Sequence, residues 1–213
     1  MNKILYPSQL EYLKSMQAEP DEIIVELEEF AAKNNVPILS KDSAKFLEIL
    51  ITLMQPKRVL ELGTAIAYSS IRIARCLGKK GIVHTIEKSE DNIRAAKENI
   101  AKASLQNKII LFEGNAFDIM PKLDKKYDFI FLDADKSDYK RLFDYSMILL
   151  KKDGIIFVDN LLWKGYTASS KVPSEYRLST KIIREFNKIF ISQKNLKTTI
   201  LPVGDGIGLG IKL

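Results

Sequence analysis

Residues 58–70 read RVLELGTAIAYSS, a run of strand-forming residues that passes through Gly63 into a segment suited to opening a helix. A strand, a tight turn and a helix in this order are typical of the first unit of a parallel β-sheet. Glycine at the turn lets the backbone fold back sharply and approach a ligand closely. If this stretch starts a parallel sheet, the same alternation of strand and helix must continue after it.

The alternation continues to the end of the chain. Strands are predicted at residues 58–62, 82–87, 109–113, 127–133, 154–159, 198–203 and 208–213. Helices are predicted at residues 66–77, 89–103, 116–121, 137–150 and 175–192. This pattern indicates an α/β protein whose parallel sheet is covered by helices on both faces. Only Gly204, Asp205 and Gly206 separate the last two strands, and Asp-Gly favours a hairpin turn, so we expect the sheet to end in an antiparallel hairpin.

The residues before this alternation have a different pattern. Within residues 1–55, helical periodicity indicates one segment after Pro7, a second from Asp21 and a third from Asp42. No linker-like or low-complexity tract divides the 213 residues. We therefore expect a single domain over residues 1–213, in which residues 1–55 form a helical N-terminal extension and residues 56–213 form the core.

Composition bears on the location of the protein and on its metal chemistry. Hydrophobic residues make up 46% and charged residues 28% of the chain, as in an ordinary globular protein. No apolar run approaches the ~20 residues of a membrane span, and the N-terminus lacks the apolar core of a signal peptide, so we expect a cytoplasmic protein with no membrane partner. The single Cys76 and the single His84 cannot form a zinc cluster, which leaves oxygen atoms as metal ligands.

The net charge of +6 is unevenly distributed along the chain. Residues 136–213 contain 14 Lys and Arg against 7 Asp and Glu, whereas residues 1–135 contain 19 against 20. This asymmetry fits a polyanionic partner such as a nucleic acid, and it also fits an ordinary solvated surface. One face of the helix predicted at 175–192 carries four basic residues, Arg177, Lys181, Arg184 and Lys188. Its opposite, core-facing side is predicted to consist of Ile182, Phe186, Ile189 and Phe190.

Ligands bind open parallel sheets beyond the carboxyl ends of the strands. Gly63 follows the first predicted strand, and Glu87 ends the second, 24 residues later. In dinucleotide-type folds, a carboxylate at about this interval accepts hydrogen bonds from ribose hydroxyls. Because the G-x-G-x-x-G that cradles a pyrophosphate is missing, an adenosyl cofactor without phosphates is favoured over a nicotinamide cofactor. The alternative is an ordinary strand–helix turn followed by a surface glutamate.

Polar side chains also end the fourth and fifth predicted strands. Asp133 ends the fourth, and Asp159 with Asn160 ends the fifth. Three hard oxygen ligands on neighbouring strands suit a divalent cation such as Mg2+, with positions left for water or substrate. The alternative is that each aspartate only caps the turn after its strand. Lys136 lies three residues after Asp133, beside this predicted metal site.

Other catalytic patterns are missing from the sequence. It contains no G-x-S-x-G elbow, no Walker motif and no Cys/His nucleophile pair. His84 lies inside the second predicted strand and is expected to be a packed residue and not a base. The chemistry is therefore expected at the glycine turn and the oxygen cluster.

Five segments resemble, in order and spacing, a known family of enzymes: ELGTAIAYSS, IEKSEDN, GNA, FLDADKSDY and VDNLLWKG. The family is that of the cation-dependent class I O-methyltransferases, which use S-adenosylmethionine and include the catechol and caffeoyl-CoA O-methyltransferases. The resemblance extends over residues 36–213 and implies a Rossmann-like class I methyltransferase sheet. The segments NVPIL, NLLWKG and PVGDG also resemble the bacterial tRNA 5-hydroxyuridine methyltransferases, which make 5-methoxyuridine at the wobble position.

The resemblance implies a role for each matching residue. The residues around S-adenosylmethionine would be Leu39, which closes over it, Gly63 and Ser69 at its methionine part, Glu87 at its ribose, and Asn115 and Ala116 at its adenine. The metal ligands would be Asp133, Asp159 and Asn160, with Asp133 also near the cofactor. Lys136 occupies the position of the base that the family is proposed to use.

The resemblance leaves the substrate open. One hypothesis is methylation of 5-hydroxyuridine in the anticodon loop of tRNA, with phosphates bound by the basic helix face and by Lys164, and the base stacked on Trp163 or Tyr166. A second is a small-molecule O-methyltransferase that acts on catechol-like phenols. A third is a non-catalytic RNA-binding module on the same fold, which the presence of Lys136 and the three oxygen ligands disfavours. The family also implies a homodimer.

Overall fold

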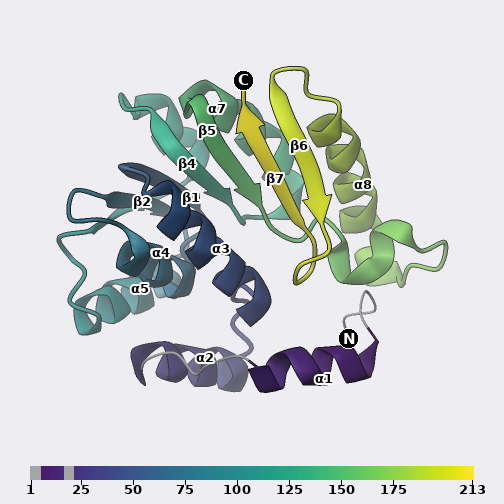
Figure 1. Cartoon of the computed structure of the whole chain (residues 1–213), viewed down its shortest axis with the longest axis horizontal. Helices are drawn as coiled ribbons and strands as arrows, with labels where there is room; N and C mark the ends of the chain where they lie inside the picture. The colour runs from purple at the N-terminus through teal and green to yellow at the C-terminus, as the bar shows by residue number, and fades with distance from the viewer. Residues whose placement is uncertain (1–5, 17–21) are drawn as a thin grey trace.

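A seven-stranded sheet forms the centre of the computed structural model, which describes residues 6–16 and 22–213 (Figure 1). Its strands are β1 (Arg58–Leu62), β2 (Ile82–Glu87), β3 (Ile109–Glu113), β4 (Tyr127–Leu132), β5 (Leu150–Val158), β6 (Leu196–Leu201) and β7 (Ile207–Lys212). They lie in the order β3-β2-β1-β4-β5-β7-β6. The strands β1 to β5 are parallel, whereas β7 pairs antiparallel with both β5 and β6. The predicted parallel sheet with an antiparallel C-terminal hairpin is confirmed.

Helices lie around this sheet. They are α1 (Pro7–Met16), α2 (Glu22–Asn34), α3 (Lys41–Met54), α4 (Tyr68–Cys76), α5 (Glu90–Lys102), α6 (Ala116–Ile119), α7 (Tyr139–Leu149) and α8 (Arg177–Ile191). They cover both of its faces, except α1, whose described side chains are all exposed. Short 3₁₀ helices are η1 (Met120–Lys122), η2 (Lys136–Asp138), η3 (Trp163–Ala168) and η4 (Ser174–Tyr176). Asp21, where the sequence predicts that the second helix begins, lies outside the described residues. Within the described parts of the chain, no helix is both long and apolar enough to cross a membrane.

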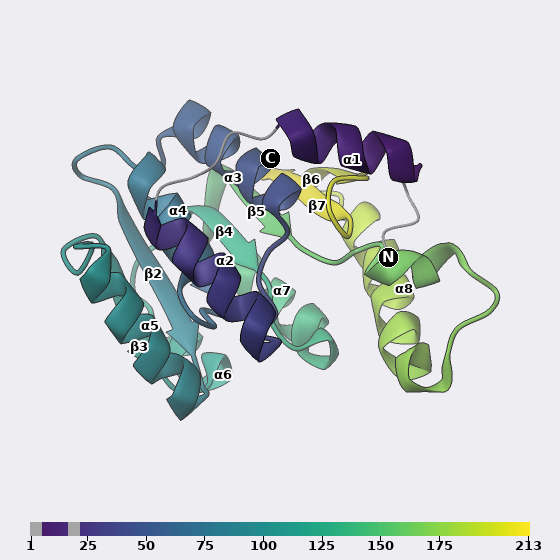
Figure 2. The same cartoon turned by 90° about the horizontal axis from the view of Figure 1, so that it is seen from below.

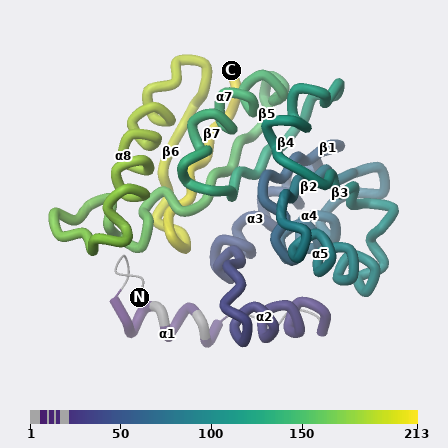
Figure 3. Tube along the Cα trace, turned by 180° about the vertical axis from the view of Figure 1, so that it is seen from behind, coloured from purple at the N-terminus to yellow at the C-terminus, as the bar shows by residue number. Residues whose placement is uncertain are grey.

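Alternating side chains of the strands fill two separate cores. On β4, Phe129 and Phe131 pack with buried residues of α3 and α4, whereas Ile130 and Leu132 pack with those of α7 and α8. Figure 2 shows α2, α3, α4 and α5 on one side of the strands. Figure 3, seen from behind, shows α7 and α8 on the other side. Burial on both faces explains why the central strands are almost continuously apolar in sequence.

The transition from α7 to β5 differs from the prediction. The sequence predicts a helix up to residue 150 and a strand from 154, but α7 ends at Leu149 and β5 begins at Leu150. The β4–β5 register shifts between the pairs Tyr127–Leu150 and Phe129–Ile155, and Asp153 has a positive φ of 60°. Residues 151–153 are Lys, Lys and Asp, so their sequence resembles a turn. An irregularity of this kind allows such polar residues to be part of a strand that is paired on either side of them.

The buried face of α8 is rotated slightly from the predicted one. Phe186 and Phe190 are buried as expected, but Ile183 and not Ile182 completes the packing. Ile182 and Ile189 are only partly buried. The four basic residues predicted on the opposite face, Arg177, Lys181, Arg184 and Lys188, are all exposed.

Gly63 controls the junction between β1 and β4. Its φ is +102°, a conformation that strains any residue with a side chain, and a Cβ atom there would overlap the carbonyl oxygen of Asp133. The Asp133 amide in turn donates to the Leu62 carbonyl oxygen at 3.0 Å. Glycine at position 63 therefore allows the first turn and the end of β4 to lie against each other.

We predict that Gly63→Ala lowers the free energy of unfolding by about 2–4 kcal/mol, because it adds both backbone strain and a steric overlap. Urea unfolding followed by circular dichroism measures this. Gly78→Ala is the matched control, since a Cβ at that position meets only Gln55 Oε1, at 3.0 Å. The control should change stability by no more than about 0.5 kcal/mol. Equal stability of the two variants would contradict the proposed role of Gly63.

Candidate active site

The carboxyl ends of the parallel strands surround a cavity of about 620 Å³. Its walls come from the ends of β1, β2, β4 and β5, from the segment before α3, from the start of α6 and from the β6–β7 turn. All candidate cofactor, metal and catalytic residues named from the sequence line this cavity, whereas Tyr166, a candidate for stacking the substrate base, does not: the lining includes Leu39, Gly63, Ser69, Glu87, Asn115, Ala116, Asp133, Lys136, Asp159 and Asn160. The structure therefore brings all of them together, although they lie far apart in the chain.

Glu87 is held rigidly at the end of β2. Only 8% exposed, it accepts a hydrogen bond from the Ala65 amide at Oε2 and from the Lys88 and Ser89 amides at Oε1, each at 2.9 Å. Ala65 belongs to the turn after β1, so this carboxylate joins the first two strand ends. Carboxylate oxygens have about four acceptor positions, which leaves capacity for a ligand hydroxyl from the cavity.

Asn115 and Phe117 shape the next part of the wall. Asn115 caps α6, because its Oδ1 accepts a hydrogen bond from the Phe117 amide at 2.9 Å. The Phe117 ring lines the cavity, and the Arg141 guanidinium covers it at 3.9 Å from the ring centroid. Phe117 was not predicted, although it directly follows the predicted adenine contacts Asn115 and Ala116, and its aromatic side chain at that position was the available signal.

Glu61 is a buried carboxylate that the sequence analysis did not single out. It is 0% exposed and accepts hydrogen bonds from the hydroxyls of Ser69 at 2.5 Å, Thr85 at 2.6 Å and Ser70. Burial raises the pKa of Glu61 to about 7. Ser69 thus lines the cavity, but its hydroxyl is used to hold α4 to β1. An acidic residue inside the otherwise apolar strand RVLEL was the signal for this interaction.

The oxygen cluster predicted to hold a cation surrounds the Lys136 ammonium group. Lys136 Nζ donates to Asn160 Oδ1 at 2.6 Å, to Asp133 Oδ1 at 3.2 Å and to the Tyr139 hydroxyl at 2.6 Å. Tyr139 is fully buried, and its hydroxyl donates to the Asp159 carbonyl oxygen at 3.0 Å. Tyr139 was not predicted, because its position at the start of α7 suggests only core packing.

Asp159 has an unusual environment for a carboxylate. It is 4% exposed, and its buried Oδ1 atom has no hydrogen-bond partner. Burial and the neighbouring Asp133 carboxylate raise the pKa of Asp159 to about 8. A buried anionic oxygen without a partner is stabilised by a bound cation, so the donor set of Asp133, Asp159 and Asn160 fits a hard divalent metal.

A metal centre built from His, Cys, Asp and Glu alone does not occur in residues 6–16 and 22–213, where no three of these side chains form a group that could hold an ion. The predicted metal ligands differ from such a group, because only Asp133 and Asp159 are carboxylates and the third ligand is the amide of Asn160. Lys136, which donates to two of the three ligands, occupies the space between them. The fit of the site to a cation therefore depends on the oxygen atoms of two carboxylates and one amide.

Asp205 also lines the cavity, from the turn between β6 and β7. Its Oδ1 accepts a hydrogen bond from the Lys164 amide at 2.5 Å, and its Oδ2 accepts one from Asn160 Nδ2 at 3.5 Å. Burial raises the pKa of Asp205. The sequence analysis used this residue only as a hairpin signal, because nothing in the local pattern shows that the turn reaches the cavity.

The segment after β5 forms the mouth of the cavity. Trp163 lies with its ring centroid 5.6 Å from Lys136 Nζ, and Tyr176 packs against Trp163 and Tyr166 at centroid distances of 6.4 and 5.2 Å. Arg184 donates to the backbone carbonyl oxygens of residues 166, 167 and 169. One of the four basic residues of α8 therefore holds the mouth together. His84, as expected, is a packed residue, with Nδ1 at 2.8 Å from the Tyr127 hydroxyl.

The glycine turn after β1, the acid after β2 and the oxygen cluster after β4 and β5 define an α/β enzyme that binds its ligands at the carboxyl edge of the sheet. A model of the O-methyltransferase family matches residues 14–213. The chain belongs to this O-methyltransferase family. Membership of an enzyme family argues against the hypothesis of a non-catalytic RNA-binding module.

Individual relatives agree with this assignment. The chain is 33% identical over 212 residues to a caffeoyl-CoA O-methyltransferase of Populus kitakamiensis, with 96% of this chain and 87% of the relative covered. It is 31% identical over 224 positions to a catechol O-methyltransferase of Niastella koreensis, with 99% of each covered. Among solved structures, the O-methyltransferase TomG of Streptomyces achromogenes, in complex with SAM, has a TM-score of 0.84 at 26% identity and covers 100% of this chain and 99% of its own.

The buried Glu61 predicts a specific dependence of stability on pH. Its pKa is about 7 in the folded protein and near the ordinary 4.5 in the unfolded chain, so the folded state binds the extra proton between these values. Its contribution to the free energy of unfolding is therefore full below pH 4.5 and is lost as the pH rises through 7, a change of about 3 kcal/mol.

Glu61→Gln removes this titration, so the difference in stability between wild type and variant should shrink as the pH rises from 5 to 8. Denaturant unfolding at a series of pH values measures it. A difference that does not change with pH would show that Glu61 titrates normally.

Proposed function

We propose that this protein is an S-adenosylmethionine-dependent and cation-dependent O-methyltransferase that converts 5-hydroxyuridine to 5-methoxyuridine at the wobble position of tRNA. The observation that carries the proposal is the buried, unpartnered Oδ1 of Asp159 beside Asp133 and Asn160, with the base Lys136 among them. The choice of S-adenosylmethionine as the cofactor is supported by the similar structure of TomG, which contains SAM. It is also supported by the position of Gly63 and Glu87 at one end of the cavity.

Asp133, Asp159 and Asn160 are the residues that would hold the cation. Mg2+ bound there would supply a positive charge that lowers the pKa of a substrate hydroxyl and orients it together with a neighbouring oxygen. The 5-hydroxyl and 4-carbonyl of 5-hydroxyuridine form such a pair, and so do the two hydroxyls of a catechol. The metal chemistry therefore fits both substrates.

Lys136 is the residue placed to take the proton from that hydroxyl. A general base acts within hydrogen-bond distance, and Lys136 Nζ reaches the atoms that would hold the cation, at 2.6 Å from Asn160 Oδ1 and 3.2 Å from Asp133 Oδ1. The Tyr139 hydroxyl accepts from the same Nζ at 2.6 Å and so fixes its position. To act as a base, Nζ must first release its ammonium proton to solvent; the uncharged amine, in the same position, would then accept the proton of the substrate hydroxyl.

The remaining cavity residues place the methyl donor next to that oxygen. Glu87 and the turn at Gly63 lie at the ends of β2 and β1, and Asp133 ends the adjacent β4, so both parts of the site share one wall. Leu39 is 4% exposed and closes the cavity from the segment before α3. Holding two reactants in line inside one cavity accounts for most of the rate enhancement expected for such a transfer.

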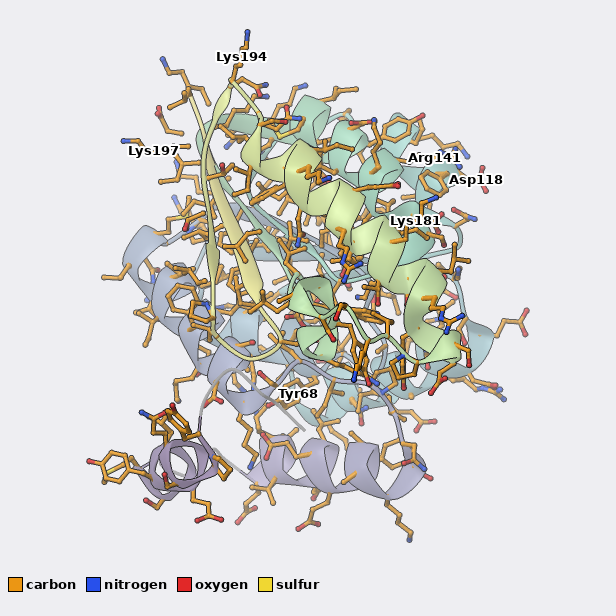
Figure 4. All side chains as sticks on the ribbon, turned by 90° about the vertical axis from the view of Figure 1, so that its right-hand side faces the viewer. Tyr68, Asp118, Arg141, Lys181, Lys194 and Lys197 are labelled. Carbon is orange, nitrogen blue, oxygen red and sulfur yellow. The ribbon has the colours of Figure 1, made fainter. Side chains whose placement is uncertain are left out.

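Charge and aromatic residues at the mouth support tRNA as the substrate. Lys164 lines the cavity, and Lys181 and Lys188 are exposed on α8, which packs against η3 at the mouth (Figure 4). Phosphates bind to such side chains, while a splayed base stacks on an aromatic ring such as that of Trp163. The resemblance of NLLWKG and PVGDG to the tRNA 5-hydroxyuridine methyltransferases supports the same substrate.

A small catechol-like phenol is the second candidate substrate. The names of the relatives favour it, since one is a catechol O-methyltransferase and another a caffeoyl-CoA O-methyltransferase. The acyl-CoA of the latter carries phosphates, so a basic mouth would suit it as well.

The decisive experiment compares the two substrate classes directly. Purified protein, S-adenosylmethionine and Mg2+ are incubated either with tRNA from a strain that lacks this gene or with catechol. Mass spectrometry of the digested nucleosides should show 5-hydroxyuridine replaced by 5-methoxyuridine, with little methylated catechol. Methylation of catechol without any change in the tRNA would establish the second candidate instead.

The homodimer remains a prediction. It is supported by apolar side chains that are exposed on the surface of the single chain. Tyr12 and Met16 on α1 are 64% and 63% exposed, and Leu53 on α3 is 78% exposed. Apolar surface of this kind is typical of a protein–protein contact. Sedimentation or light scattering measures the mass in solution.

We predict that Asp159→Ala lowers methyl transfer about 100-fold or more, because it removes a cation ligand and with it the charge that stabilises the oxyanion. Cofactor affinity should change little, since Glu87 and Gly63 are untouched. Initial rates and calorimetric titration with S-adenosylmethionine measure the two effects. Asp144→Ala, which removes an exposed carboxylate paired with Lys140, is the control. Full activity of the Asp159 variant would exclude the metal mechanism.

A second prediction concerns the surface of α8. The double substitution Lys181→Ala and Lys188→Ala should weaken tRNA binding and make its salt dependence less steep by about 0.7–0.9 for each phosphate that is no longer neutralised. Methylation of a free phenol should not change. The matched control removes the same charge at Lys194 and Lys197, which Figure 4 shows at the top and upper left, well above Tyr68 of the cavity wall. An equal fall in tRNA affinity in both double variants would show that the net charge of the protein, and not the position of the lysines on α8, determines tRNA binding.

A further inference from the structure

The segment that follows β5 has a strained backbone. Asn160, Trp163 and Lys164 have φ values of 63°, 46° and 55°, and Gly165 follows with 81°. For a residue with a side chain, the left-handed conformation is unfavourable, and it persists only where surrounding contacts impose it. Asn160, Trp163 and Lys164 also line the cavity. The contacts that impose this conformation therefore determine the shape of the site.

Those contacts come from Asp205. Its carboxylate accepts hydrogen bonds from the Lys164 amide at 2.5 Å and from Asn160 Nδ2 at 3.5 Å, and its backbone carbonyl oxygen accepts one from the Leu162 amide at 2.8 Å. One residue of the β6–β7 turn thus bonds to three positions of the strained segment. The Lys164 contact is the strongest, because it is short and the acceptor is charged.

The turn that carries Asp205 is itself tightly packed. A Cβ atom at Gly206 would collide with Leu162, and one at Gly204 would collide with the hydroxyls of Ser40 and Ser43 at the start of α3. Such close packing on both sides leaves the turn little freedom to move. The Asp205 carboxylate is therefore presented to the strained segment at a defined position.

Asp205 also determines how the amide of Asn160 is oriented. The amide has one face that donates and one that accepts. Because Nδ2 is directed to Asp205 Oδ2, Oδ1 is directed to Lys136 Nζ, 2.6 Å away, and so toward the proposed cation ligands. A rotated amide would present hydrogen atoms to a cation and repel it.

We infer that Asp205 is a positioning residue that directs the Asn160 oxygen toward the cation and holds Trp163 and Lys164 at the mouth of the cavity. The inference rests on the proposed function, because it assigns Asn160 to cation binding. It applies to the substrate side of the site only. On the proposed cofactor side, Gly63 follows β1 and Glu87 ends β2, and the Glu87 carboxylate is held by the amides of Ala65, Lys88 and Ser89.

Two independent signals can report on Asp205. Trp163 is the sole tryptophan of the chain, so quenching of its fluorescence by acrylamide measures how firmly the strained segment is held. Binding of Mn2+, followed by electron paramagnetic resonance, measures the affinity of the oxygen cluster without any turnover. Calorimetric titration with S-adenosylmethionine and the thermal midpoint report on the cofactor side and on the fold.

Asp205→Ala should raise the Kd for Mn2+ about 10–100-fold, as expected when the group that orients a metal ligand is removed. It should also raise the quenching constant of Trp163 toward that of the unfolded protein, with the Kd for S-adenosylmethionine unchanged. Asp205→Asn keeps only one side-chain acceptor oxygen, so it can accept from the Lys164 amide but not from Asn160 Nδ2 at the same time. Its quenching should therefore stay near the wild-type value while its Mn2+ affinity falls, and this variant keeps the test valid if the alanine variant does not fold.

Two comparison variants separate the effects. Ser179→Ala removes the hydroxyl that accepts from Trp163 Nε1 at 2.9 Å, so it should raise quenching and leave Mn2+ binding unchanged. Asp144→Ala, which removes an exposed carboxylate on α7, should change neither signal. Wild-type Mn2+ affinity and wild-type quenching in Asp205→Ala would overturn the inference. Failure of the wild-type protein to bind Mn2+ would instead refute the proposed cation site, and the quenching data alone would then decide whether Asp205 holds the segment.

Discussion

The buried carboxylate of Glu61 is the interaction on which the site depends. It accepts hydrogen bonds from hydroxyls of α4 and of β2, and so joins the first helix of the core to two neighbouring strands. A carboxylate with three hydroxyl donors and no cation is costly to bury, and its raised pKa records that cost. Two residues after Glu61, the turn at Gly63 lies against the end of β4, so the proposed cofactor side of the cavity is next to Asp133.

The other half of the site concentrates charge in a different way. Asp133, Asp159 and Asp205 approach one another at the ends of β4, β5 and the hairpin, and the other two carboxylates raise the cost of ionising Asp159. The ammonium group of Lys136 lies among them and offsets part of this repulsion. In the proposed function, a divalent cation held by these carboxylates would take over the balancing charge, and Lys136 could then act as a base once it has lost its ammonium proton.

The two halves differ in how they are built. The cofactor side is formed by turns that directly follow β1, β2 and β3, and its side chains are fixed by nearby backbone amides, as at Glu87 and Asn115. The substrate side is assembled from segments distant in sequence, since the strained residues after β5 depend on Asp205 and on Arg184 of α8.

The sequence by itself determined the α/β alternation, the terminal hairpin and many of the residues that line the cavity. It did so because apolar periodicity reports burial along a strand or helix, and because all parallel strands end at the same edge of the sheet. Only the tertiary structure revealed the roles of Glu61, Tyr139 and Asp205, whose partners Thr85, Asp159 and Lys164 lie 20 or more residues away. It also showed that β5 begins earlier than its polar residues suggest. The partner of a buried polar side chain is decided by how distant elements pack, and no local pattern records that choice.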